Sequence, residues 1–273
     1  MFVLARVNSS YDYKVYKKMS DEDVKNFIFL NEKIKEIENM SYVKNIAQKN
    51  NQNFLDFIKE KINGLNDKTK GRAHFKFDEY HEEGLDLILK SILLSRTIIE
   101  NIRVDVEKSF DKGDNNLKKF KSMIKNKDLE IMRYLRNFSF HYTLPISTSS
   151  IRYDILKGQY NGFNFYSYKA DLIEKNFFRK HESKFINQTV DDKLVYNDYI
   201  PKWMNLINQM YEFYIEYKSK SISSEFKNFH KNYNDFITID QVHVMDVNPN
   251  GTYTKYVIDK DIYNLLVKVL IKK

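Results

Sequence analysis

Residues 131–142 read IMRYLRNFSFHY, and this stretch predicts the end of a long helix with two unlike faces. At about 100° per residue, large apolar side chains spaced by three or four residues share one face and form a core stripe. These are Ile131, Leu135, Phe138 and Tyr142. A polar row recurs every four residues on a different face and contains Arg133, Asn137 and His141, with Arg136 and Phe140 beside it. Surface helices usually carry Lys and Glu there, so this face is a candidate functional site.

Periodicity elsewhere in the chain predicts a mostly α fold. Apolar stripes predict helices at about residues 21–39, 54–64, 78–110, 116–142, 198–236 and 261–270. Ser20 and Asp23 have the spacing of a capping box at the first of these helices, and residues 65–72 read as a polar linker. Alternating segments predict an edge strand at 11–16, a hairpin at 151–168 around Asn161-Gly162, and a hairpin at 237–258 around residues 248–251. We therefore expect a helical bundle with a β-hairpin insert and a C-terminal β-hairpin.

The composition excludes several classes of protein. The chain has no cysteine, so disulfides, thiolate nucleophiles and cysteine-bound metals are excluded. Its six histidines lack the four-residue spacing of a zinc helix, so we expect no metal and no other cofactor. No apolar run approaches the roughly 20 residues that span a bilayer, so we expect a cytoplasmic protein without membrane contact. The net charge of +8 permits a polyanionic partner.

The residues at 136–141, RNFSFH, resemble the ribonuclease motif of HEPN domains. That motif is an arginine, four to six residues and a histidine, commonly with a polar residue directly after the arginine, a place that Asn137 fills here. The resemblance covers roughly residues 20–236, with an insert at about 146–198, and implies an HEPN-like bundle with two long central helices. Residues 237–273 would form a hairpin and a short helix packed on it.

One departure from the family concerns the way in which some HEPN toxins are neutralised. Some HEPN toxins carry a tyrosine two residues after the histidine, which a partner nucleotidyltransferase modifies. Here Thr143 fills that place and Tyr142 precedes it, so this mode of neutralisation is not implied.

The resemblance implies RNA cleavage without a metal ion. The 2′-hydroxyl of RNA attacks the adjacent phosphate and leaves a 2′,3′-cyclic phosphate and a 5′-hydroxyl. Histidine has an unperturbed pKa of about 6.5, so His141 is the candidate for proton transfer near neutral pH. Arg136 can bind the phosphate and stabilise the charge of the transition state. Asn137 can orient the imidazole or donate to a phosphate oxygen, and Arg133 is the candidate substrate-binding residue.

The expected partners are RNA, a second copy of the chain, and an antitoxin or defence partner. The role in a toxin–antitoxin or antiviral defence system rests on family analogy alone. On an ideal helix, the side chains of Arg136 and His141 point about 140° apart. Phe140, with Tyr134 at its margin, gives the same face large apolar groups, which suggests that another surface covers it. HEPN proteins generally build a composite site at a two-fold axis, so we expect a homodimer with the motif helices meeting there. The alternative is that another part of the same chain covers Phe140.

Two alternatives to an endonuclease remain open. One is a catalytically silent HEPN-like module that binds a nucleic acid or a protein, although the intact Arg136/His141 pair favours the enzyme. The other is a helical scaffold with a chance motif. In that case Arg133, Arg136 and Asn137 are ordinary surface residues and the helix dipole favours His141 near the C-terminus.

Four further features have less specific signals. Arg96 and Glu100 could support the site, but an ordinary surface pair one turn apart is the expected interpretation. His81 is followed by two glutamates, yet no second histidine lies one turn away to complete a metal site. The aromatic segment 163–168 could stack on bases, although we expect core packing. Trp203 is expected in the core.

Overall fold

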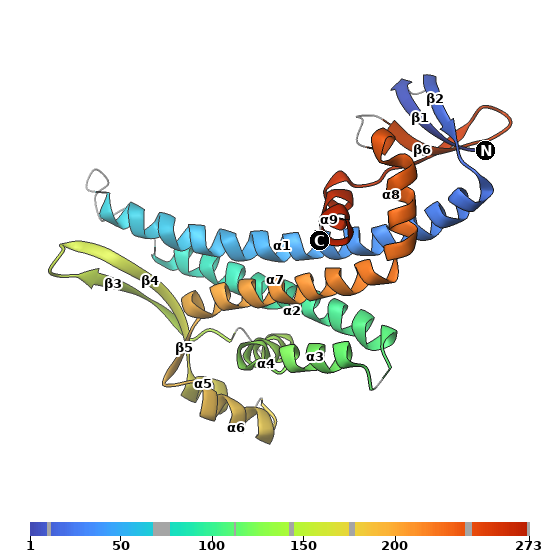
Figure 1. Ribbon diagram of the computed structural model, residues 1–273. Helices are drawn as coiled ribbons and strands as arrows, with labels where there is room; N and C mark the ends of the chain where they lie inside the picture. The colour runs from blue at the N-terminus through green and yellow to red at the C-terminus, as the bar shows by residue number, and fades with distance from the viewer. Residues whose placement is uncertain are drawn as a thin grey trace. The chain divides into compact units, whose positions relative to one another are not determined.

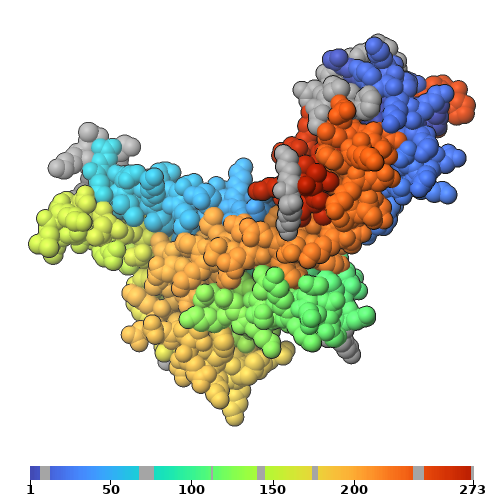
Figure 2. Space-filling view, in the orientation of Figure 1, coloured from blue at the N-terminus to red at the C-terminus, as the bar shows by residue number. Residues whose placement is uncertain are grey.

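The structure, a computed structural model, describes residues 1–9, 12–67, 77–111, 113–141, 145–174, 178–237 and 242–271 (Figure 1, Figure 2). Within these ranges the protein is mostly helical and carries two small antiparallel sheets, which confirms the predicted class. Most of the predicted linker at 65–72 lies outside the described residues, as do Tyr142 and Thr143 and the side chains of Phe140 and His141. Among the described helices, none combines the length and the apolar character needed to cross a membrane.

The helices in the described ranges are α1 (Asp21–Asn66), α2 (Phe77–Ser109), α3 (Asn115–Ile124), α4 (Lys127–His141), α5 (Lys169–Glu174), α6 (Lys180–Thr189), α7 (Tyr196–Ser221), α8 (Ser223–Ile237) and α9 (Lys260–Leu270). The strands are β1 (Phe2–Ser9), β2 (Asp12–Lys18), β3 (Thr148–Asp154), β4 (Gln159–Tyr168), β5 (Lys193–Val195), β6 (Val242–Val247) and β7 (Tyr253–Tyr256).

The chain divides into two compact units. Unit 1 consists of Met1–Ser41 and Phe213–Lys273, and unit 2 consists of Tyr42–Glu212. The sequence instead predicts one bundle at 20–236 with residues 237–273 appended to it. The two divisions differ because β1 pairs with β6, which groups residues from both ends of the sequence.

Unit 1 is built on a four-stranded sheet in the order β2-β1-β6-β7. β2 is an edge strand, as its sequence predicts, and β6 and β7 form the predicted C-terminal hairpin. Phe27 of α1 contacts the ring of Tyr256 edge-on, with ring centroids 5.6 Å apart. The sheet also buries an apolar cluster that consists of Val3, Ala5, Met245 and Val247.

In unit 2, the β3–β4 hairpin packs its aromatic side chains into the core. Phe163 and Phe165 are fully buried and lie against Phe57 and Phe54 of α1. A Cβ at Gly84 of α2 would lie 2.0 Å from the Phe165 ring, so this close approach requires a glycine. The core interpretation is therefore confirmed for these two phenylalanines.

The capping box that was predicted at the start of α1 is present. The Ser20 Oγ accepts a hydrogen bond from the Asp23 amide at 3.2 Å and donates to its carboxylate at 2.7 Å. This pairing satisfies one of the amide groups that a helix start leaves without a partner.

α1 is one helix of 46 residues, whereas the sequence predicts two helices separated by residues 40–53. The predicted gap contains a polar run, but Asn50 and Asn51 are buried against α2. The Asn50 amide donates to the Ser91 Oγ at 2.9 Å, and the Asn51 amide donates to the Ser95 Oγ at 3.2 Å. Because a neighbouring helix supplies these partners, α1 continues through the polar run.

Two other predicted helices are each divided in the structure. The predicted helix at 116–142 is α3 and α4, because the Asn126 Oδ1 accepts from the Asp128 amide at 2.8 Å and caps a new helix. The predicted helix at 198–236 is α7 and α8, which divide at Ile222. There the Ser219 and Ser221 hydroxyls donate to backbone carbonyls of the preceding turn.

The turn of the β3–β4 hairpin lies at residues 155–158 and not at Asn161-Gly162. Gly158 has a φ of +63°, which glycine adopts at little cost. The Asp154 carboxylate accepts from the Lys157 amide at 3.1 Å and stabilises the turn. Gly162 lies within β4, opposite Arg152.

Candidate functional site

α4 separates the two rows of the predicted motif as their spacing predicts. Its core stripe is buried at Ile131, Leu135 and Phe138. The polar residues Arg133, Arg136 and Asn137 are partly exposed, and they lie on the helix that packs against α2. His141 is the last residue of α4, but its side chain lies outside the described residues. The structure therefore locates three of the four predicted site side chains.

Within α4, each arginine has a defined contact. The Arg136 Nη1 donates to the Asn137 Oδ1 at 3.3 Å, so the amide oxygen of Asn137 faces a cation and its NH2 group is the donor that its predicted role requires. The Arg133 Nη2 lies 2.5 Å from the Glu130 carboxylate, and its guanidinium lies over the Tyr134 ring. The buried Arg133 Nε has no hydrogen-bond partner among the described residues.

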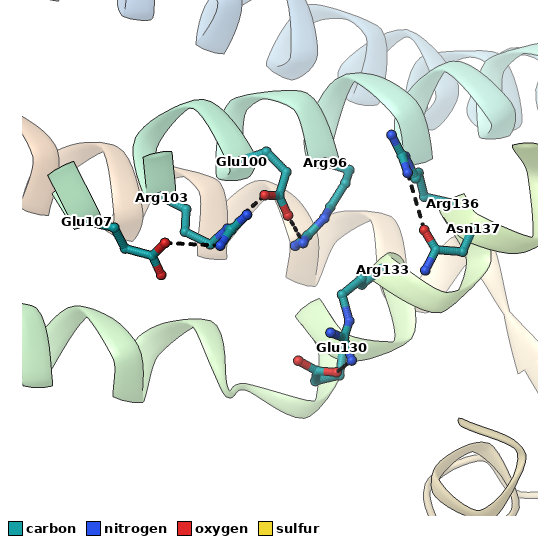
Figure 3. A network of polar contacts seen from close by, with 8 residues as sticks. All are labelled: Arg96, Glu100, Arg103, Glu107, Glu130, Arg133, Arg136 and Asn137. Atoms are coloured by element: carbon teal, nitrogen blue, oxygen red, sulfur yellow. Dashed lines mark hydrogen bonds and ion pairs between the residues drawn. The ribbon is translucent and has the colours of Figure 1, made fainter. Parts of the chain in front are cut away.

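α2 adds a charged row that the predicted site lacked (Figure 3). The Glu100 carboxylate bridges two arginines, because it forms an ion pair with Arg96 and lies 2.7 Å from the Arg103 Nε. The Arg103 Nη1 lies 3.0 Å from the Glu107 carboxylate. The expected pair of Arg96 and Glu100 one turn apart is present, but the Arg96 side chain is only 15% exposed and so lies deeper than an ordinary surface pair.

The arginines of the two helices affect one another's ionisation. Burial, and after it the charges of Arg133, Arg103 and Arg136, lower the pKa of Arg96 to about 10, while Glu130 acts in the opposite direction. Placing like charges together costs folding free energy, and such arrangements concentrate at functional sites. We call Arg96, Arg103, Arg133 and Arg136 the arginine cluster. Arg96 remains protonated at neutral pH, so the cluster is cationic.

The contribution of α2 had a signal in the sequence, but an ambiguous one. Arg96 and Arg103 are seven residues apart, as are Glu100 and Glu107, so they form one stripe of alternating charge. Such a stripe is typical of a solvent-exposed helix face. Only the packing of α2 against α4 shows that the stripe lies beside the motif.

The aromatic face that was predicted for dimer contact is partly covered by the same chain. Tyr134 is 4% exposed and contacts Phe185 of α6, with ring centroids 5.5 Å apart, and Phe178 just before α6. Tyr134 is therefore not part of an exposed contact surface. Phe140, the other residue of that prediction, has a side chain outside the described residues.

The remaining candidates have structural roles. The His81 Nδ1 lies 2.9 Å from the Ser149 Oγ, and its ring stacks on those of Phe77 and Phe165. Trp203 is fully buried, as expected, and its indole N–H donates to the Asp128 carbonyl. In the part of the chain that the structure describes, no group of three His, Asp or Glu residues is placed to hold a metal ion.

Comparison of the chain with models of protein families, with curated proteins and with solved structures found no match. The resemblance to HEPN domains thus rests on the motif at residues 136–141.

Proposed function

We propose that this chain is a metal-independent RNA endonuclease of the HEPN type, acting in the cytoplasm in a toxin or phage-defence system. The observation that carries the proposal is the arginine cluster. Arg96 and Arg103 of α2 and Arg133 and Arg136 of α4 lie on two helices that pack together, and burial, followed by the charges of the other three arginines, lowers the pKa of Arg96. A bound phosphate would offset the cost of placing these like charges together, since guanidinium groups bind phosphate with charge-assisted hydrogen bonds.

In the proposed mechanism, the substrate supplies the nucleophile and the protein supplies charge and proton transfer. The 2′-hydroxyl attacks the adjacent phosphorus, the bond to the 5′-oxygen breaks, and a 2′,3′-cyclic phosphate and a 5′-hydroxyl result. His141 takes the proton from the 2′-hydroxyl and delivers a proton to the departing 5′-oxygen. Arg136 stabilises the charge on the phosphoryl oxygens. Asn137, which accepts a hydrogen bond from Arg136, keeps that guanidinium near the phosphate. DNA lacks the 2′-hydroxyl and would not be cleaved.

The second candidate function is a catalytically silent module that binds a nucleic acid or a protein. The ion pairs favour it, because Glu130 and Glu100 contact Arg133 and Arg96, the guanidinium groups that a reacting phosphate would need. A binding module and an enzyme would share the arginine cluster, whereas only the enzyme requires the imidazole of His141.

The deciding experiment is incubation of the purified protein with mixed RNA in EDTA. The wild-type protein should cleave RNA, whereas His141→Ala and Arg136→Ala should each lose at least about 100-fold in rate, because acid–base catalysis and stabilisation of the transition-state charge each contribute about that much. End-group analysis should find 2′,3′-cyclic phosphates.

Matched controls are His181→Ala and Arg152→Ala, exposed residues of the same unit that lie outside the proposed site. Both should cleave at the wild-type rate. Cleavage that EDTA abolishes, or that survives in both motif variants, would show that the mechanism is wrong. Binding without cleavage in the wild-type protein would favour the silent module.

A further inference from the structure

The charged row of α2 lies on the helix that packs against α4, which carries Arg136 (Figure 3). Arg96 and Arg103 are two helical turns apart, which separates their Cα atoms by about 10.5 Å along α2. Both side chains form ion pairs with carboxylates of the same helix, which favour one orientation of each guanidinium group (Figure 3). Guanidinium groups with a favoured orientation lose less conformational entropy on binding than mobile ones do.

Three glutamates form ion pairs with Arg96, Arg103 and Arg133. Glu100 is shared between Arg96 and Arg103, and Arg133 keeps a buried Nε without a hydrogen-bond partner among the described residues. Burial, followed by the charges of the other three arginines of the cluster, lowers the pKa of Arg96. A phosphate group would add charge-assisted hydrogen bonds to these guanidinium groups.

We propose that Arg96 and Arg103 bind the backbone of the RNA strand beside the scissile phosphate, so that the substrate is a strand with several consecutive phosphates and not a dinucleotide. This inference rests on the proposed function, because Arg136 defines the scissile position. Successive phosphates of one stacked strand advance by about 3.4 Å, so a strand along α2 presents more than one phosphate to this pair. Arg96 and Arg103 are substrate-binding residues and take no part in bond cleavage.

The test is RNA affinity in the His141→Ala protein, which binds substrate without consuming it. For a six-nucleotide RNA, Arg96→Gln and Arg103→Gln should each raise Kd about tenfold at about 50 mM salt. Each should also reduce the salt slope of log Kd by about one, because one phosphate contact is lost. A dinucleoside monophosphate should bind equally to all variants. Arg96→Lys should restore the salt slope, since it retains the charge.

The control is Arg152→Gln, an exposed arginine on β3 that bonds Asn161 and should bind as the parent does. Circular dichroism and the melting temperature identify any variant that fails to fold. If Arg96→Gln fails to fold, the RNA affinities of Arg96→Lys and Arg103→Gln test the inference. If Arg96→Gln and Arg103→Gln bind RNA as tightly as the control does, the inference is wrong. Cleavage of RNA by the wild-type protein would then leave the nuclease proposal intact. If these two variants bind RNA more weakly but the wild-type protein does not cleave RNA, the contact of Arg96 and Arg103 with RNA is supported and the nuclease proposal is contradicted. A parent protein that binds no RNA overturns both.

Discussion

At the scale of single residues, we expect the positive charges of the arginine cluster to contribute more to RNA binding than its ion pairs contribute to folding stability. The Arg133 side chain is 39% exposed, and surface pairs such as the one with Glu130 contribute about 0–1 kcal/mol. Its removal should therefore have little effect on folding, while it removes a donor from the proposed phosphate site.

We predict that Arg133→Ala weakens RNA binding more than it slows cleavage of bound RNA. The free energy of unfolding should fall by less than about 1 kcal/mol, and KM should rise with kcat nearly unchanged because the contact exists before the reaction begins. Steady-state kinetics and urea unfolding measure both. A loss confined to kcat would instead place Arg133 in the chemical step.

We predict that the protein loses folding stability at alkaline pH, because two tyrosines of unit 1 have raised pKa values. Burial raises the pKa of Tyr263 to about 12, and the pKa of Tyr233 is raised by burial and by Asp23. Between about pH 10, the ordinary pKa of tyrosine, and pH 12, the folded state keeps a proton that the unfolded state loses. The stabilisation is thus complete below pH 10 and falls as the pH rises.

Tyr263→Phe should reduce this dependence. Between about pH 10 and 11, the variant should lose about 1 kcal/mol less unfolding free energy than the wild type does. Urea unfolding at several pH values measures the difference, and the value at pH 7 corrects for the lost contact with His230. Identical slopes in the two proteins would contradict the assignment.

At the scale of elements, the continuity of α1 depends on buried amides. Asn50→Ala should remove the hydrogen bonds to the Ser91 hydroxyl and the Leu87 carbonyl, and it should cost about 1–3 kcal/mol of unfolding free energy. A double-mutant cycle with Ser91→Ala isolates the pair. Gln52→Ala is the matched control, because Gln52 is exposed on the same helix and should change stability by less than about 0.5 kcal/mol. Equal effects at both positions would show that helix propensity, and not burial, governs this segment.

Elements with local signals could be predicted from the sequence, and those set by neighbours could not. The Ser20 capping box, the C-terminal hairpin and the core stripe of α4 each depend on residues within one or two turns. In contrast, the polar run at Asn50 and Asn51 reads as a helix break until α2 supplies its partners. Similarly, Asn161-Gly162 has the sequence of a tight turn, but Asp154 and Gly158 form a turn earlier.

The candidate site follows the same pattern. Arg133, Arg136, Asn137 and His141 were identified from the polar row of one helix together with the resemblance to the HEPN motif, and the structure locates the first three side chains on α4. Arg103 was not identified, because its relation to these residues arises from the packing of α2 against α4. Single-sequence periodicity carries no information about which helix lies opposite.

At the scale of the whole molecule, the motif predicts a functional homodimer. Two copies of α4 at a two-fold axis would bring two Arg136 and two His141 residues into one composite site. Light scattering at micromolar concentration should therefore report a dimer, and mixing Arg136→Ala with wild-type protein should reduce activity more than dilution does. Because α6 covers Tyr134, the contact must be made by other residues of the motif face. A monomer that still cleaves RNA would contradict the composite site.

The pairing of β1 with β6 also has a consequence for how the protein is made. The ribosome releases β1 more than 230 residues before its partner, since β1 ends at Ser9 and β6 begins at Val242. At about 5–20 residues per second, that interval is roughly 10–50 s. Throughout it, the nascent chain exposes the apolar strand Phe2–Ser9 without the neighbour that completes its sheet, while all of residues 42–212 emerge and can fold. Chaperone binding to residues 2–9 is therefore expected during this interval of translation.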